Sequence, residues 1–137
     1  MVLMGIAFLA ESYLGRLVEN PDQMGSLAAK LLSSGDDAVI FVSEGKNGLD
    51  GMIGMVVHEH FVSGERVAGE IFWYVAPTAR GSIGIRLLKE AERWAKSRQA
   101  VTLQVVAPAG AERVAGVYKA LGFSAVETMW QRPLGGS

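Results

Sequence analysis

The feature that most constrains the fold is a change of hydrophobic period in the middle of the chain. Three successive runs, residues 37–43, 51–60 and 67–76, have the alternation or the β-branched composition of strands. Turns that contain glycine separate these runs. From Ile83 to Arg98 the apolar residues recur at helical spacing instead. Hairpin-connected strands followed by an amphipathic helix predict a mixed sheet with helices packed against it.

The remaining segments complete a predicted element order of ααβββαβαβ. We expect two N-terminal helices, at residues 3–17 and 21–35. After the helix that begins at Ile83 we expect a strand buried on both faces at 101–106, a further helix at 111–121 and a last strand at 124–131. Val114, Val117 and Leu121 form the predicted buried stripe of the last helix. No linker or repeat divides the chain, so we expect one α/β domain over residues 1–133 and a flexible tail over 134–137.

Composition excludes several classes of function. Thirteen Lys and Arg against 14 Asp and Glu give a net charge of −1, which is no sign of affinity for nucleic acid or anionic lipid. The chain has no cysteine, and its only histidines, His58 and His60, lack a third partner for zinc, so we expect no metal. The apolar N-terminus lacks the basic leading region of a signal peptide, and no run reaches the ~18 apolar residues of a membrane span. We therefore expect a cytoplasmic protein that binds neither membrane nor nucleic acid.

A glycine-rich loop follows the third predicted strand and leads into the helix. Its sequence is Arg80-Gly81-Ser82-Ile83-Gly84. Free N–H groups at a helix start attract anions, and glycines let the backbone approach a phosphate closely. The spacing fits neither a P-loop nor a dinucleotide-binding fingerprint. From the residues alone, a structural connection and a phosphate site both stay open.

This loop and a second motif resemble the GCN5-related N-acetyltransferase (GNAT) superfamily. The loop is similar to the family's Arg/Gln-x-x-Gly-x-Gly/Ala segment after its fourth strand. The segment from Tyr118 to Phe123 is similar to the family helix that ends in Tyr-x-x-Leu-Gly-Phe. The two motifs occur in the family's order, and the resemblance covers roughly residues 37–132. It implies a twisted mixed sheet flanked by helices, with an opening between the strand that ends near Val75 and the strand that starts near Val101.

The resemblance also implies acetyl-CoA as the acetyl donor. In the family the loop binds the pyrophosphate, and the backbone of the preceding strand binds the pantetheine arm. Carried over to this chain, the cofactor-binding residues are Trp73, Tyr74, Val75, Arg80, Gly81, Ser82, Ile83 and Gly84. The implied activity is direct N-acetylation of a primary amine on a small molecule or a peptide. The acceptor stays unidentified, and a homodimer stays open.

Amine acetylation needs a group that removes the amine proton and a group that protonates the leaving thiolate. The resemblance puts the family's general acid at Tyr118. Glu70 is the candidate base, because several family members keep a glutamate on the strand before the loop. Strand alternation predicts one face for Glu70 and Phe72. A packed tyrosine and a solvated carboxylate are the structural alternatives, and His58 or His60 is a weaker candidate for the base.

Two departures from the family pattern favour an alternative function. The loop is about one residue shorter than the usual form, with Ile83 where glycine is often found, and Ala111 stands where the family often has asparagine. They favour a CoA-binding, regulatory or interaction module with little or no catalysis on the same fold. A further alternative is an unrelated α/β domain that binds another phosphate ligand.

Overall fold

A computed structural model describes residues 37–46, 48–77 and 81–135. In chain order the elements are β1 (Ala38–Gly45), β2 (Gly48–Glu59), β3 (Arg66–Val75), α3 (Ser82–Ser97), β4 (Thr102–Gln104) and α4 (Glu112–Ala120). The chain forms two compact units, Met1–Val106 and Ala107–Ser137. The helices predicted at 3–17 and 21–35 lie outside the described residues, and the prediction of a single domain over 1–133 stays a prediction.

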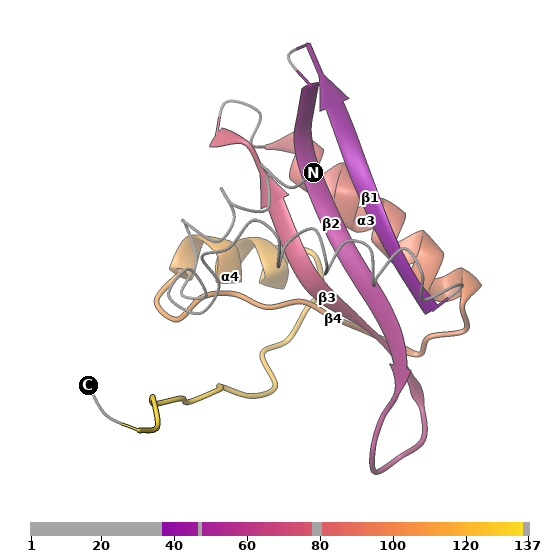
Figure 1. The fold of residues 1–137 in the computed structure, drawn as a ribbon, viewed down its shortest axis with the longest axis vertical. Coiled ribbons are helices and arrows are strands. Elements are labelled where there is room, and N and C mark those ends of the chain that lie inside the picture. The colour runs from indigo at the N-terminus through magenta and orange to yellow at the C-terminus, as the bar shows by residue number, and fades with distance from the viewer. Residues whose placement is uncertain (1–36, 47, 78–80, 136–137) are drawn as a thin grey trace. The chain divides into compact units, whose positions relative to one another are not determined.

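The first unit contains a four-stranded sheet in the order β1-β2-β3-β4 (Figure 1). β2 pairs with β1 and β3 in antiparallel fashion, whereas β3 and β4 are parallel and are connected through α3. The predicted mixed sheet is therefore confirmed, and the ends of β1, β2, β3 and α3 differ from the predicted ends by one to three residues.

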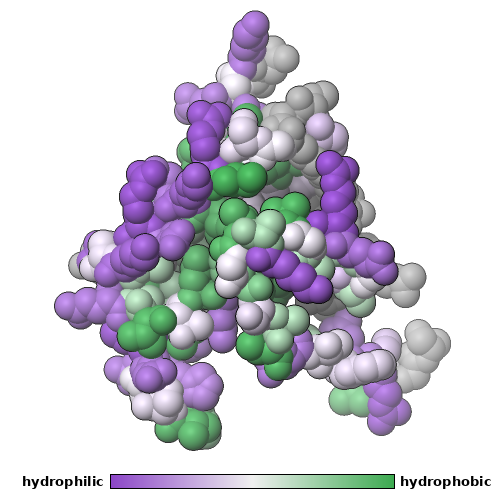
Figure 2. Space-filling view, turned by 180° about the vertical axis from the view of Figure 1, so that it is seen from behind, coloured by the Kyte–Doolittle hydropathy of each residue, from purple (hydrophilic) through white to green (hydrophobic). Residues whose placement is uncertain are grey.

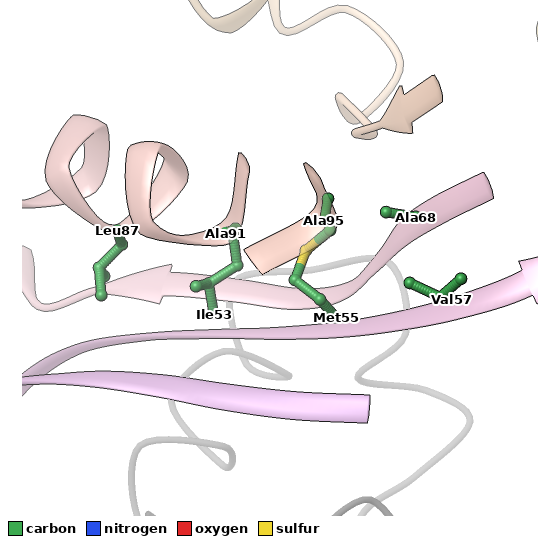
Figure 3. Packing of buried hydrophobic residues seen from close by; sticks show 7 residues of the cluster. All are labelled: Ile53, Met55, Val57, Ala68, Leu87, Ala91 and Ala95. Carbon is green, nitrogen blue, oxygen red and sulfur yellow. The ribbon is translucent and has the colours of Figure 1, made fainter. Parts of the chain in front are cut away.

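The main core lies between α3 and one face of the sheet. Seven buried side chains form it: Ile53, Met55, Val57, Ala68, Leu87, Ala91 and Ala95. Figure 3 shows Ile53 and Met55 of β2 facing Ala91 and Ala95 of α3, whose small side chains let the helix approach the strands closely. The opposite face carries a second buried cluster of Ala38, Met52, Phe72 and Tyr74. Figure 2 shows the surface of the molecule from behind the view of Figure 1. Hydrophobic residues, in green, lie toward the middle of this view, and hydrophilic residues, in purple, lie around them.

β4 differs from the predicted strand over residues 101–106. It contains three residues, Thr102–Gln104, and both of its end residues are exposed, so the expected burial on both faces is wrong. The reason is its place in the described sheet, where β3 is its only neighbour. A strand at the edge of a sheet pairs with one neighbouring strand instead of two, so more of its surface is exposed than that of a central strand.

The second unit is built around α4 and differs from the prediction in two ways. α4 has no buried residue, and Val114, Val117 and Leu121 keep 36, 41 and 40% of their surface exposed, so their predicted burial is wrong. One short helix followed by extended chain provides no second layer within the unit to cover an apolar stripe. Residues 124–131, expected as the last strand, form no strand. A β-type sequence forms a strand only where a neighbouring strand supplies hydrogen bonds, and no strand among the described residues pairs with it.

Two further observations concern membranes and metals. Among the described residues, no helix combines the length and the apolar composition that crossing a membrane requires. Within the same part of the chain, no three Asp, Glu or His side chains gather closely enough to hold a metal ion.

Candidate active site

A β-bulge in β3 decides which face of the sheet Glu70 occupies. Gly54 and Met55 are consecutive in β2, but they pair with Phe72 and Glu70, so Ile71 is an extra residue on β3. Directly paired residues of neighbouring strands share a face. Met55 belongs to the core under α3 and Phe72 to the opposite cluster. The predicted common face of Glu70 and Phe72 is therefore wrong, because a bulge shifts the alternation by one residue.

β3 and β4 part next to Glu70. Their ladder joins Val67–Gly69 to Thr102–Gln104 and ends there, whereas β3 continues to Val75. The backbone N–H of Val106 donates a hydrogen bond of 3.2 Å to Oε1 of Glu70. The carboxylate of Glu70 thus accepts a hydrogen bond from a backbone N–H just beyond the last residue pair of the β3–β4 ladder. Val106 is not among the site residues predicted from the sequence, because no residue pattern shows which backbone N–H a distant side chain will accept a hydrogen bond from.

The surroundings of Glu70 favour its protonated form. Burial raises the pKa of Glu70 from 4.5 to about 7, and the hydrogen bond from Val106 opposes part of this rise. A carboxyl group that titrates near neutral pH can both accept and release a proton under ordinary conditions. The position therefore suits a general base or acid.

The raised pKa of Glu70 predicts that stability falls as pH rises. Between pH 4.5 and about 7 the folded protein keeps a proton on Glu70 that the unfolded chain has released. The contribution to stability is thus complete below pH 4.5 and lost above about pH 7. At roughly 1.4 kcal/mol for each pKa unit, the loss is about 3 kcal/mol.

Urea denaturation of the wild type and of Glu70→Gln at pH 4.5, 6 and 8 measures this loss. We expect the wild type to lose about 3 kcal/mol more than Glu70→Gln over this range. An identical pH dependence in the two proteins would show that Glu70 titrates near its ordinary pKa.

The start of α3 has features that would suit an anion. Gly81 precedes the helix with φ 127°, which L side chains rarely adopt, so glycine is needed there. The first turn contains no acidic residue, and no side chain caps it. The N–H groups at Ser82, Ile83 and Gly84 therefore carry the partial positive charge of the helix start. Arg80, the remaining residue of the predicted phosphate loop, lies outside the described residues.

The structure brings part of the predicted cofactor-binding set together. A Cβ added to Gly84 would lie 3.6 Å from Cγ2 of Val75 and 3.7 Å from Cζ2 of Trp73, so the first turn of α3 packs on the end of β3. Tyr74 belongs to the cluster on the opposite face of the sheet and is 9% exposed. Its predicted contact with a cofactor can therefore involve only its backbone.

Tyr118 belongs to the second unit, near the end of α4. Phe123 N–H donates to the Tyr118 carbonyl at 3.0 Å and Gly122 N–H to the Lys119 carbonyl at 3.1 Å, with φ 92° at Gly122. This is the Schellman arrangement that ends many helices. The rings of Tyr118 and Phe123 also pack, with their centroids 5.7 Å apart. The Tyr-x-x-Leu-Gly-Phe segment thus ends the helix and gives the tyrosine ring a packing partner.

His58 and His60 have no comparable setting. His58 pairs with Val67, on the face of the sheet opposite to Glu70. His60 accepts the N–H groups of Val62 and Ser63 on Nδ1, each at 3.2 Å, and so stabilises the turn between β2 and β3. Both histidines are exposed. His60 therefore has a structural role in this turn.

Comparisons with known proteins identify the family and the fold. The model of the acetyltransferase (GNAT) family matches residues 9–123. A search of curated proteins finds no match. Among solved structures, a transcriptional regulator from Bacillus halodurans superposes with a TM-score of 0.80 at 19% identity, covering 97% of this chain and 93% of that one.

Two enzymes are similar in the same way. Glucosamine-6-phosphate N-acetyltransferase from Arabidopsis thaliana has a TM-score of 0.72 at 15% identity and covers 98% of this chain and 95% of its own. AAC(6')-Iy, in complex with the bisubstrate analogue CoA-S-monomethyl-acetylneamine, has a TM-score of 0.76 at 16% identity, with coverages of 96% and 89%. At such identities these structures show that the fold is shared.

Proposed function

Because the chain belongs to the acetyltransferase (GNAT) family, we propose that it transfers an acetyl group from acetyl-CoA directly to a primary amine. The observation that carries the proposal is the setting of Glu70. Its carboxyl group, with a pKa of about 7, lies where β3 and β4 part, and β3 leads through a loop into an uncapped helix start. The proposed proton acceptor and the proposed anion-binding segment thus belong to consecutive elements, β3 and α3.

Glu70 removes the amine proton in this proposal. An alkylamine has a pKa of about 10, so nearly all of it is protonated at neutral pH and has no free lone pair. The deprotonated carboxylate takes that proton directly or through a water molecule, while Oε1 stays hydrogen-bonded to Val106. The freed lone pair then attacks the thioester carbonyl carbon, and the C–S bond breaks after the C–N bond has formed. The nitrogen loses its second proton to solvent as the amide forms, and Glu70 later releases its own proton to solvent. A backbone amide of β3 is the proposed donor to the developing oxyanion.

Tyr118 protonates the leaving thiolate in this proposal. A phenol has a pKa near 10 and a thiol near 8.5, so the transfer is feasible in a site that excludes water. The phenolate regains its proton from solvent after CoA leaves. Tyr118 stands at the tyrosine of the family motif, and its ring is held against Phe123.

Acetyl-CoA binding is assigned to the loop and to the end of β3. The backbone at Gly81, Ser82, Ile83 and Gly84, with Arg80 from the family motif, takes the pyrophosphate, and the backbone of Trp73, Tyr74 and Val75 takes the pantetheine arm. The positive φ of Gly81 and the absence of acidic residues in the first turn of α3 support the first assignment. The fold shared with AAC(6')-Iy, which was solved with a CoA-containing analogue, supports CoA as the ligand.

A charge change at Ser82 tests the pyrophosphate assignment. Ser82 is exposed at the first position of α3, where a carboxylate stabilises the helix by roughly 0.3–1 kcal/mol. The same carboxylate repels a pyrophosphate. Ser82→Glu should therefore keep or raise thermal stability while weakening acetyl-CoA binding about tenfold or more in calorimetry, which is about 1.4 kcal/mol. Ser82→Gln, similar in size but neutral, is the matched control, and equal affinities of the two variants would remove the helix start from the site.

Thiol release from acetyl-CoA, followed with a panel of amines, tests the activity itself. The panel should include an amino sugar phosphate, an aminoglycoside and a lysine peptide, because similar structures include a glucosamine-6-phosphate N-acetyltransferase and an aminoglycoside 6'-N-acetyltransferase. Amine-dependent thiol release supports the enzyme. CoA binding without thiol release would favour the non-catalytic binding module instead, and calorimetry that finds ATP but not CoA bound would overturn both. A cytoplasmic location stays a prediction, and a homodimer stays open.

A further inference from the structure

A glycine of β2 lies directly under the first two turns of α3. A Cβ added to Gly51 would lie 2.9 Å from Cδ1 of Leu87 and 3.2 Å from Cγ2 of Ile83. Both separations are shorter than ordinary contacts between carbon atoms, which begin near 3.5 Å. The helix therefore approaches β2 as closely as it does because residue 51 has no side chain.

The two neighbours of Gly51 leave little room for adjustment. Ile83 is β-branched, its Cγ2 is bonded directly to Cβ, and χ1 of such residues has one strongly preferred value in a helix. Leu87 is 5% exposed and is part of the core under α3, so its neighbours limit its movement. A methyl group at position 51 would therefore require Leu87 and Ile83 to shift, and their limited freedom passes part of that shift to the turns of α3 that carry them.

A second contact supports the same turn from the neighbouring strand. Gly51 pairs with Val75 at the end of β3, and Gly84 of α3 packs on Val75 and Trp73. The first turn of α3 thus rests on β2 through Ile83 and on β3 through Gly84. Together the two contacts set the height of the helix start above the sheet.

We propose that Gly51 is a positioning residue for acetyl-CoA. It lets the start of α3 settle at the height at which the N–H groups of Ser82, Ile83 and Gly84 meet the pyrophosphate while the pantetheine arm follows β3. The proposal rests on the proposed function, because its effect is observed through CoA binding. Hydrogen bonds weaken steeply with distance and angle, so a small lift of this turn weakens several contacts at once.

Gly54 is a matched control on the same strand. A Cβ there would lie 2.6 Å from Cε1 and Cζ of Phe72, on the face of the sheet away from α3. Alanine at either glycine overpacks a buried contact and should lower thermal stability. Only alanine at position 51 presses against the helix that carries the proposed phosphate site.

The test compares Gly51→Ala with Gly54→Ala by calorimetry with CoA and by steady-state kinetics. We expect Gly51→Ala to raise the Kd of CoA and the KM of acetyl-CoA about tenfold or more, with kcat within about twofold of the wild type at saturation. Gly54→Ala should keep the Kd within about twofold despite its lower melting temperature. An unchanged Kd in Gly51→Ala, or an equal rise in both variants, would overturn the positioning role.

A second-site change keeps the proposal testable if Gly51→Ala folds poorly. Adding Leu87→Ala removes Cδ1, the atom nearest to the new methyl group, and the Kd of the double variant should return to that of Leu87→Ala alone. A double variant as weak as Gly51→Ala, or weaker, would contradict the proposal. A wild-type protein that binds no CoA would instead overturn the proposed function, so the two failures are distinguishable.

Discussion

Replacing Glu70 by glutamine should lower the rate of acetyl transfer at neutral pH by roughly 10²–10⁴-fold, the usual effect of losing a general base. Glutamine is nearly the same size, and its side-chain oxygen can still accept the Val106 N–H. The variant therefore removes the proton acceptor while keeping the hydrogen bond that orients it. Measurement of kcat/KM for the amine from pH 5.5 to 9.5 tests this expectation.

The pH profile separates catalysis by Glu70 from a structural role. Wild-type activity should rise with pH through about 7, because the carboxylate must be deprotonated to accept a proton and burial raises its pKa to that value. The glutamine variant should show no levelling near pH 7. Its activity should keep rising with the neutral fraction of the amine, so its defect should shrink toward pH 9.5. A defect of equal size at every pH would assign Glu70 to substrate positioning. His58→Ala, on the other face of the sheet, is the control and should be close to the wild type.

Tyr118→Phe should lower turnover by roughly 10²-fold or more while acetyl-CoA binding stays nearly intact. The variant keeps the ring, and with it the contact to Phe123 and the backbone hydrogen bonds that end α4. Only the hydroxyl group is lost. Stability should change by no more than about 1 kcal/mol, the usual net value of one hydrogen bond.

Phe123→Leu is the matched control for the tyrosine. It keeps the hydroxyl of Tyr118 but removes the ring that packs against it, so it should cost more stability and less turnover than Tyr118→Phe. Rates are compared per folded molecule, with the folded fraction taken from circular dichroism. Turnover of Tyr118→Phe close to that of the wild type would remove Tyr118 from the mechanism, and a large loss of stability with normal turnover would make it a packing residue.

The elements that the sequence predicted well are those whose signals are local. Alternating apolar residues and glycine turns were enough for β1, β2 and β3, and helical spacing was enough for α3. The end of α4 is equally local, because the hydrogen bonds of Gly122 and Phe123 return to carbonyls three to five residues earlier. In each case the residues that determine the structure are close neighbours in the chain.

The candidate site was predicted only in part, because its decisive features depend on residues far apart in the chain. Alternation within β3 alone predicts one face for Glu70 and Phe72, and only the pairing with β2 introduces the bulge that separates them. The raised pKa of Glu70 arises from its burial, and its hydrogen-bond partner Val106 lies 36 residues away. A glycine inside a strand can indicate a close approach of another segment. Only the packing of α3 on β2, however, identifies Ile83 and Leu87 as the groups above Gly51.

The strands that the prediction overestimated have the same physical explanation. Residues 101–106 and 124–131 have strand-like composition, but a strand exists only where another strand completes its hydrogen bonds. β3 provides such a partner to three residues, Thr102–Gln104, and no described strand provides one to residues 124–131. Local sequence therefore determined which segments can form strands and helices and how α4 ends. Register, burial and close packing between distant segments determined where β4 stops, which face Glu70 occupies and how closely α3 approaches the sheet, because these depend on contacts that form only when the chain has folded.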